Sequence, residues 1–173
     1  MISLFINRIF RSIKIDPEVF NEIKKDKRAT LSAAIVVILS STAAGIGATA
    51  LGVNNLILAP IYSLISWFIW AYIVYFVGVK LFPDLKTKTT QFALLRVIGF
   101  SSAPGIIRIF AFNEGLMIVT FLGSFIWMLA CMVVAVKETL NYKSLWKALG
   151  VVIISWLMQG FILLAILVIT RNV

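Results

Sequence analysis

The longest uncharged stretch of the chain runs from Ala29 to Val79 and contains 51 residues. As one α-helix it would be about 76 Å long, whereas the hydrocarbon core of a bilayer is about 30 Å thick. The stretch must therefore fold back once. The sequence GVNNL at 52–56 supplies glycine and asparagine, which favour a turn. We predict a first membrane span over 29–51 and a second over 56–79.

The remaining chain has the same apolar character. Of the 173 residues of the whole chain, 61% are hydrophobic and 13% are charged. A soluble domain is about half apolar and about a quarter charged. Polar segments at 80–91, 113–115 and 137–144 separate three further apolar stretches. The sequence therefore predicts an all-α integral membrane protein, a five-transmembrane-helix bundle in a single membrane domain over 29–173. The last three spans are predicted at 92–112, 115–136 and 149–170.

The basic residues predict how these spans are oriented. There are 16 lysines and arginines. Fourteen fall in segments on one predicted side of the membrane, and only Arg108 and Arg171 fall on the other. Loops this short follow the positive-inside rule. We therefore expect a cytoplasmic N-terminus and a C-terminus outside.

Residues 1–28 precede the first span and are predicted to form an amphipathic and juxtamembrane helical arm. Apolar residues recur at helical spacing from Ile2 to Ile13, with basic residues mostly beside that stripe. This helix lies either in the cytoplasmic interface or against the protein's own spans. A second helix begins at Asp16, a capping residue, and Pro17, which suits the first helical position. We interpret the lysines that follow as anchors for anionic lipid headgroups, with a partner-binding site as the alternative.

Several functional classes lack the residues they need. The chain has no histidine and one cysteine, Cys131, so a Cys/His metal site or a histidine-based triad is not expected. The net charge is +9, and most of the basic residues flank apolar runs. This distribution fits binding to lipid headgroups better than binding to nucleic acid. We therefore predict neither an enzyme nor a cofactor-binding or nucleic-acid-binding protein.

Two arginines flank or enter the third span. Arg96 and Arg108 bracket eleven uncharged residues, or about 16 Å of helix, and each side chain reaches about 6 Å toward its nearer interface. In this interpretation both arginines anchor the ends of the third span at the membrane interfaces. Alternatively, one of them pairs inside the bundle or lines a polar cavity. Glu138 is a candidate partner for Arg96, and Glu114 is one for Arg108.

Pro104 interrupts the third span. It removes a backbone hydrogen bond and clashes with the preceding turn, so we predict a bend near 100–104. Ser101 and its neighbour Ser102 can bond the carbonyls that the proline frees. Gly99 is small enough to let another helix approach closely.

These features together resemble the Yip family, the Ypt/Rab-GTPase-interacting membrane proteins, and most closely its short prokaryotic members. The stretches that carry the resemblance are DPEVFNEIKKD (16–26), LKTKTTQFALLRVIGFSSAP (85–104) and AVKETLNYKSLWKAL (135–149). The most specific pattern within them is formed by Gly99, Phe100, Ser101 and Pro104. The resemblance implies a five-span bundle with a cytoplasmic N-terminus in a prokaryotic cell membrane.

The resemblance also implies partners. Eukaryotic relatives bind small Rab GTPases, but this chain lacks their long hydrophilic N-terminal region and its Asp-Leu-Tyr-Gly-Pro-like motif, so a small GTPase is expected by resemblance only. The leading hypothesis is a non-enzymatic membrane scaffold or adaptor that contacts lipids, other membrane proteins or itself. The alternative is a small transporter or channel component with a polar path near Arg108 and Pro104.

Overall fold

The computed structural model describes residues 2–49, 58–85 and 87–171, apart from the side chains of residues 114, 163, 165–167 and 169–171. Within these residues every regular element is helical. In chain order the elements are α1 (Ile2–Ile13), α2 (Pro17–Lys25), α3 (Ala29–Ala48), α4 (Leu58–Tyr75), the π-helix η2 (Phe76–Leu81), α5 (Gln91–Ser101), the 3-10 helix η3 (Ala103–Phe110), α6 (Glu114–Leu140) and α7 (Leu145–Arg171).

Five helical segments are long and apolar enough to cross a bilayer. They are Ala29–Ala48, Leu58–Leu81, Gln91–Phe110, Gly115–Leu140 and Leu145–Ile162. The predicted fold class, an all-α membrane protein with five spans, is therefore confirmed, and the chain is a multi-pass membrane protein. The turn predicted at 52–56 lies outside the described residues.

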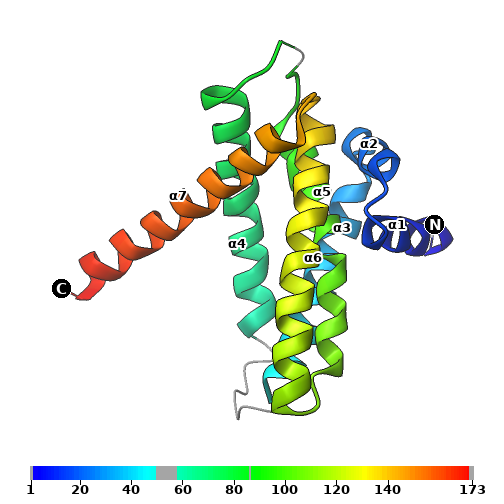
Figure 1. Ribbon diagram of the computed structural model, residues 1–173, viewed down its shortest axis with the longest axis vertical. Coiled ribbons are helices and arrows are strands. Elements are labelled where there is room, and N and C mark those ends of the chain that lie inside the picture. The colour runs from blue at the N-terminus through cyan, green and yellow to red at the C-terminus, as the bar shows by residue number, and fades with distance from the viewer. Residues whose placement is uncertain (1, 50–57, 86, 172–173) are drawn as a thin grey trace.

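The spans surround a central helix. Helices α3, α4, α5 and α6 run side by side along the long axis, and α5 contacts the other three (Figure 1). Helix α7 crosses α4 obliquely, and its C-terminal end stands away from the bundle, whereas α1 and α2 lie on the other side. The side chains of α5 from Ala93 to Ser101 are all buried. The third span thus forms the axis of the molecule.

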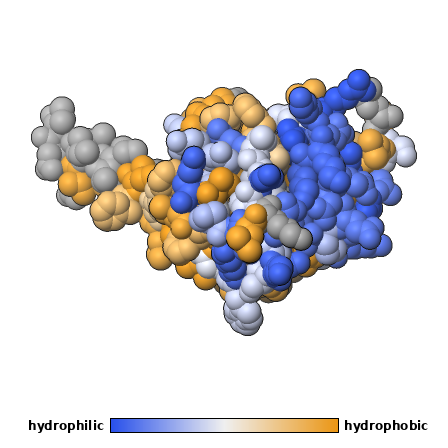
Figure 2. Space-filling model, turned by 90° about the horizontal axis from the view of Figure 1, so that it is seen from above, coloured by the Kyte–Doolittle hydropathy of each residue, from blue (hydrophilic) through white to orange (hydrophobic). Residues whose placement is uncertain are grey.

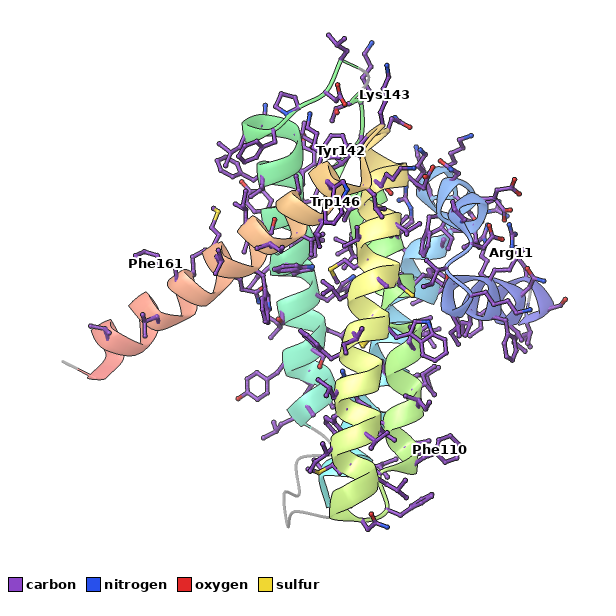
Figure 3. All side chains as sticks on the ribbon, in the orientation of Figure 1. Arg11, Phe110, Tyr142, Lys143, Trp146 and Phe161 are labelled. Carbon is purple, nitrogen blue, oxygen red and sulfur yellow. The ribbon has the colours of Figure 1, made fainter. Side chains whose placement is uncertain are left out.

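The two ends of the bundle differ in polarity. We call the end that holds α2, the loop at 82–90 and the turn at 141–144 the basic end; Tyr142 and Lys143 mark it in Figure 3, and Phe110 marks the opposite end. Seen from above the basic end, hydrophilic residues gather on the side where α1 and α2 lie (Figure 2).

The third span changes helix type where the sequence predicted a bend. Helix α5 ends at Ser101, and Pro104 lies in the first turn of the 3-10 helix η3. The Ser101 hydroxyl donates to the carbonyl of Ile98 (2.7 Å), and the Ser102 hydroxyl donates to that of Gly99 (2.6 Å). A 3-10 helix rises about 2.0 Å per residue, against 1.5 Å in an α-helix. The second part of the span is therefore longer than an α-helix with the same number of residues would be.

One apolar cluster fills the half of the bundle nearer the basic end. It includes Phe100 of α5 and Leu140 of α6, both fully buried. Val19, Phe20 and Ile23 of α2 are also fully buried in it. The second helix of the arm is therefore part of the core, whereas the sequence indicated only that it leads to the membrane edge.

Helix α1 lies beside the middle of α6. The indole Nε1 of Trp127 donates to the carbonyl of Ile13 (2.8 Å), and the thiol of Cys131 donates to that of Ser12 (3.3 Å). One apolar face of α1, formed by Phe5, Ile9 and Ile13, packs against the core. A second apolar face is exposed and comprises Ile2, Leu4, Ile6 and Phe10.

Candidate functional site

Arg96 joins the third span to the arm at the basic end. Its side chain is buried, and its Nε donates to the carbonyl oxygen of Ile23 (3.2 Å) while Nη2 donates to that of Lys24. These carbonyls belong to the last turn of α2. Carbonyls in the last turn of a helix lack intrahelical partners and carry partial negative charge. Arg96 therefore caps the C-terminus of α2.

The predicted pair between Arg96 and Glu138 does not form. The Glu138 carboxylate instead accepts from Asn21 Nδ2 (2.9 Å) on one oxygen and from Lys137 Nζ (2.9 Å) on the other. Helix α2 packs against both α5 and α6, so it supplies hydrogen-bonding groups to the arginine and to the glutamate separately. The prediction was wrong because it left α2 out of the bundle.

The end of α6 forms a second group of contacts. Asn141 ends the helix in the left-handed conformation (φ 54°). Lys24 Nζ donates to the carbonyl of Glu138 (2.6 Å) and to the side-chain oxygen of Asn141 (3.1 Å). The hydroxyl of Thr87 donates to the carbonyl of Leu140 (3.1 Å). The arm and the loop at 82–90 are therefore both attached to this turn.

Tyr142 attaches the same turn to the second span. Its hydroxyl lies 2.7 Å from the carbonyl oxygens of Gly78 and Phe82, at the π-helix η2. Burial, with a smaller effect from Asp84, raises the pKa of Tyr142 to about 12, so the phenol stays a neutral donor at physiological pH. A Cβ at Gly78 would lie 2.5 Å from the Leu140 side chain, so a larger residue here would force that leucine to move.

These contacts bring three distant stretches of sequence together. Residues 16–26 supply Asn21 and Lys24, residues 85–104 supply Thr87 and Arg96, and residues 135–149 supply Glu138 and Tyr142. We call this hydrogen-bonded cluster the basic-end junction. It fixes the arm to the third and fourth spans and, through Tyr142, joins the end of the fourth span to the second.

Acidic residues of the arm neutralise part of its charge. Arg8 pairs with Asp26 (2.8 Å), and Arg11 pairs with Asp16 and Glu22 (2.7 Å each). Asp16 also caps α2 by accepting from the Glu18 amide (2.9 Å), and Pro17 is the first residue of that helix. The nearby guanidinium groups lower the pKa values of Asp16 and Asp26.

Four cations of the arm remain exposed and make no ion pair with the residues that the structure describes. They are Lys14, Lys25, Lys27 and Arg28, and we call them the arm surface. The side of the molecule that holds the arm is hydrophilic in Figure 2. The arm thus presents unpaired positive charge from a fixed position.

Gly99 and Phe100 position the third span against its neighbours. A Cβ at Gly99 would lie 2.8 Å from the Cβ of Ala33 and 3.0 Å from the ring of Trp67. Phe100 is fully buried and meets Phe5 of α1 edge to face, with ring centroids 6.4 Å apart. These two predicted residues therefore hold α3, α4 and α1 against α5.

Arg108 lies in the other half of the bundle. Its Nε donates to the hydroxyl of Ser124 (2.7 Å), and its guanidinium carbon lies 5.2 Å from the ring centroid of Phe121. The side chain borders a cavity of about 470 Å³, and Pro104 is buried in the same 3-10 helix. The side chain of Glu114, the acidic partner predicted for Arg108, lies outside the described part of the structure.

Sequence reasoning missed several residues that the structure brings to these sites. They are Asn21, Lys24, Ser40, Ser124 and Tyr142. One signal was available, because Val19, Phe20 and Ile23 share a helical face between polar residues and so mark α2 as buried on one side. No such sequence signal was available for the two serines and Tyr142, because the role of each side chain depends on which helix lies opposite it.

Comparison with known proteins supports the resemblance inferred from the sequence. The family model described as Yip1 domain matches residues 10–167, nearly the whole chain. The matched region includes the basic-end junction and both arginines of the third span. A search of curated proteins and a search of solved structures each returned no match.

Proposed function

Since this chain belongs to the Yip1 domain family, we propose that it is a non-enzymatic membrane scaffold or adaptor that binds its partners through the basic end. The observation that carries the proposal is the basic-end junction, in which Arg96, Lys24 and Tyr142 attach the arm, the second span and the end of α6 to one another. A surface held in this way can recruit a partner without being ordered first, which lowers the entropic cost of binding.

The arm surface is the proposed contact region. Arg8 and Arg11 are neutralised by acidic residues of the arm, whereas Lys14, Lys25, Lys27 and Arg28 are exposed. Unpaired lysines and arginines next to a membrane attract anionic headgroups or acidic protein segments. In the proposed orientation the basic end faces the cytoplasm, because 14 of the 16 basic residues fall on that side.

The position of α1 supports a contact with lipid. Helix α6 has 27 residues and is therefore about 40 Å long, roughly 10 Å more than the hydrocarbon core. If α6 begins at the opposite interface, Trp127 and Cys131 lie about 5 to 10 Å below the interface of the basic end. That is the depth at which amphipathic helices bind membranes. The exposed apolar face of α1 then meets acyl chains while the arm surface meets headgroups.

Photo-crosslinking in native membranes tests the proposal. A photoreactive amino acid at Lys27 is expected to form crosslinks to other membrane proteins, to a second copy or to lipid. The same probe at Leu116, which is exposed at the opposite end, is the control for random collisions. The substitution Arg96→Met should weaken the crosslinks from position 27 but not those from position 116. The scaffold function would be refuted if the protein remained an uncrosslinked monomer with the probe at either position.

The proposed orientation needs its own experiment. Because five spans place the termini on opposite sides, a fluorescent protein fused before Met1 should be active in the cytoplasm, and alkaline phosphatase fused after Val173 should be active outside. Activity of only one of the two reporters would place both termini on the same side and would overturn the number of spans.

The alternative hypothesis of a transporter or channel component receives less support. A cavity does lie beside Arg108, but fully buried apolar residues such as Phe20, Phe100 and Leu140 fill the other half of the bundle. A transport path would need a hydrated route through that half. The geometry therefore favours a binding role for the region near Arg108.

A further inference from the structure

Two cavities adjoin each other between the membrane-spanning helices. The smaller one, of about 470 Å³, lies between α3, α4, η3 and α6 and is lined in part by serines and Arg108. The larger one, of about 980 Å³, is an apolar groove between α4, α6 and α7. Val37, Ser63, Ser102 and Met128 line both cavities. The two volumes fall within the range of small-molecule sites in proteins, about 300 to 1,000 Å³.

The smaller cavity contains hydrogen-bond donors without acceptors. Arg108 bonds the neutral hydroxyl of Ser124 through Nε and approaches only the weak acceptor Met128 Sδ (3.5 Å) through Nη2. Among the described residues no acceptor is recorded for its Nη1. Ser40, which is 5% exposed, and Ser63 likewise have no recorded hydroxyl partner in the described part of the chain. These groups suit an anion, because a guanidinium pairs most strongly with phosphate or carboxylate oxygens.

The backbone of Arg108 lies near the end of the third span. The 3-10 helix ends two residues later, at Phe110, so the arginine backbone lies about 4 Å from the end of the span. Phosphate groups of the surrounding lipid occupy this level of a bilayer. The guanidinium reaches inward from this level to Ser124, ten residues after the first residue of α6, so a lipid phosphate meets it by entering the smaller cavity.

The larger cavity continues from the polar one into an apolar groove. Trp67 and Trp70 of α4, Phe125 of α6 and Trp156 and Phe161 of α7 form its walls. The groove is open because α7 diverges from α4 toward its C-terminal end (Figure 1), and Figure 3 shows Phe161 on that diverging part. Such a surface matches an acyl chain in chemistry and shape.

We propose that the two cavities form one binding site for an anionic phospholipid. The phosphate binds Arg108 and the hydroxyls of Ser40 and Ser63, and one acyl chain enters the groove between α4, α6 and α7. Charge complementarity identifies the occupant, because a free phosphate would leave the groove empty. A helix from a second copy would leave the guanidinium without an anion. None of the four residues of the arm surface lines either cavity, so this site is independent of the proposed scaffold function.

Native mass spectrometry of the full chain in mild detergent tests the proposal. The protein is incubated with phosphatidylglycerol, phosphatidylcholine or inorganic phosphate, and bound molecules are counted. Arg108→Gln removes the cation. Gly160→Leu fills the groove, since a Cβ at Gly160 meets no atom within 4 Å and the glycine lines the groove. Lys88→Gln, at an exposed loop position of the basic end, removes one charge elsewhere.

We expect one phosphatidylglycerol molecule on the unmodified protein and on Lys88→Gln, with about tenfold weaker retention after either Arg108→Gln or Gly160→Leu. If Arg108→Gln does not fold, Ser40→Ala and Gly160→Leu decide the outcome. The proposal is overturned if the unmodified protein holds no lipid, if it retains phosphatidylcholine equally well, or if the variants retain lipid unchanged. Inorganic phosphate binding that Gly160→Leu does not affect would indicate a free-anion site instead, and a dimer without lipid would indicate that a second copy fills the groove.

Discussion

The guanidinium of Arg96 caps α2, with its Nε 3.2 Å from the carbonyl oxygen of Ile23. No carboxylate takes part in this contact. The positive charge of the arginine is instead stabilised by the partial negative charge at the C-terminus of α2, more than 70 residues earlier in the chain. An amphipathic arm is thereby fixed to the central helix of the bundle.

Replacing Arg96 by methionine should destabilise the protein and release the arm. A hydrogen bond to a charged group contributes about 1.5 to 3 kcal/mol, so the two bonds predict a loss of about 3 kcal/mol in the free energy of unfolding. Thermal unfolding in detergent measures the loss, and tryptic cleavage within 24–28 should become faster. The control Arg28→Met removes an exposed cation; equal effects in both variants would contradict the capping role.

Tyr142→Phe should weaken the link between the end of α6 and the second span. The substitution removes the hydroxyl that bonds Gly78 and Phe82 but keeps the ring. Since the carbonyls are then left with fewer donors, we expect a cost of about 1 to 2 kcal/mol. Thermal unfolding in detergent provides the measurement. Tyr72→Phe, at an exposed tyrosine of α4, should have almost no effect, and a result in the reverse order would contradict the prediction.

Gly99→Ala should be costly although it adds a single methyl group. The new Cβ would lie 2.8 Å from Ala33 Cβ and 3.1 Å from the Ala33 carbonyl oxygen, which belong to the rigid helix α3. Overpacking of this kind costs about 1 to 3 kcal/mol. Unfolding midpoints should fall for Gly99→Ala but not for Gly123→Ala, where a Cβ meets no atom within 4 Å. Unchanged midpoints in both variants would show that α3 and α5 can separate freely.

Pro104→Ala should allow α5 to continue as an α-helix. Between Ala103 and Arg108, a change from 120° to 100° per residue rotates the arginine by about 100° and shortens the segment by about 2.5 Å. Arg108 would then leave Ser124, and lipid retention should fall as it does in Arg108→Gln. Electron spin resonance distances between labels at Phe110 and Leu122 should change by several ångströms.

The control for this experiment is Pro83→Ala, which changes a proline in an exposed loop. The distance between the two labels should remain the same in this variant. If Pro104→Ala also leaves the distance unchanged, packing rather than proline maintains the 3-10 helix.

Acidification should release the arm. The pKa values of Asp16 and Asp26 are lowered, chiefly by hydrogen bonds from Arg11 and Arg8. The folded state therefore binds fewer protons than the unfolded state at these groups. Their contribution is fully present above the unfolded pKa of about 4 and is lost as the pH falls through the folded-state values.

Hydrogen exchange of α1 and α2 between pH 7 and pH 3 measures this release, after correction for the intrinsic effect of pH on exchange. Protection of α1 should fall below about pH 4. The variant Asp26→Asn should already show weakened protection at pH 7. If its protection profile matches that of the unmodified protein throughout, the ion pairs do not hold the arm.

The number of spans could be predicted because hydropathy and charge encode it locally. The uncharged stretch from Ala29 to Val79 admits only two crossings, and Pro104 marks the place where the third span changes. The type of change was not predictable from the proline alone. It involves close packing of η3 in addition to the proline, since a Cβ at Gly105 would overlap the Ser40 side chain and one at Gly47 would meet the Arg108 carbonyl at 2.5 Å.

The candidate sites were only partly predictable. Two arginines within an apolar stretch indicated that Arg96 and Arg108 are exceptional. A guanidinium, however, can donate to carboxylates, carbonyls and hydroxyls alike. The sequence offered Glu138 for Arg96, whereas the structure supplies carbonyls of α2. Which partner is used depends on the placement of α2, and its short apolar face of Val19, Phe20 and Ile23 did not specify that placement.

The position of α1 beside the middle of α6 gives the molecule unequal cross-sections. In the half nearer the basic end the arm adds to the four central helices, and in the other half it does not (Figure 1). A protein with this taper occupies more area in one leaflet than in the other, and the bilayer relieves the mismatch by bending. Many copies in one patch are therefore expected to accumulate where the broader leaflet lies on the convex side, since amphipathic helices at the interface respond to curvature.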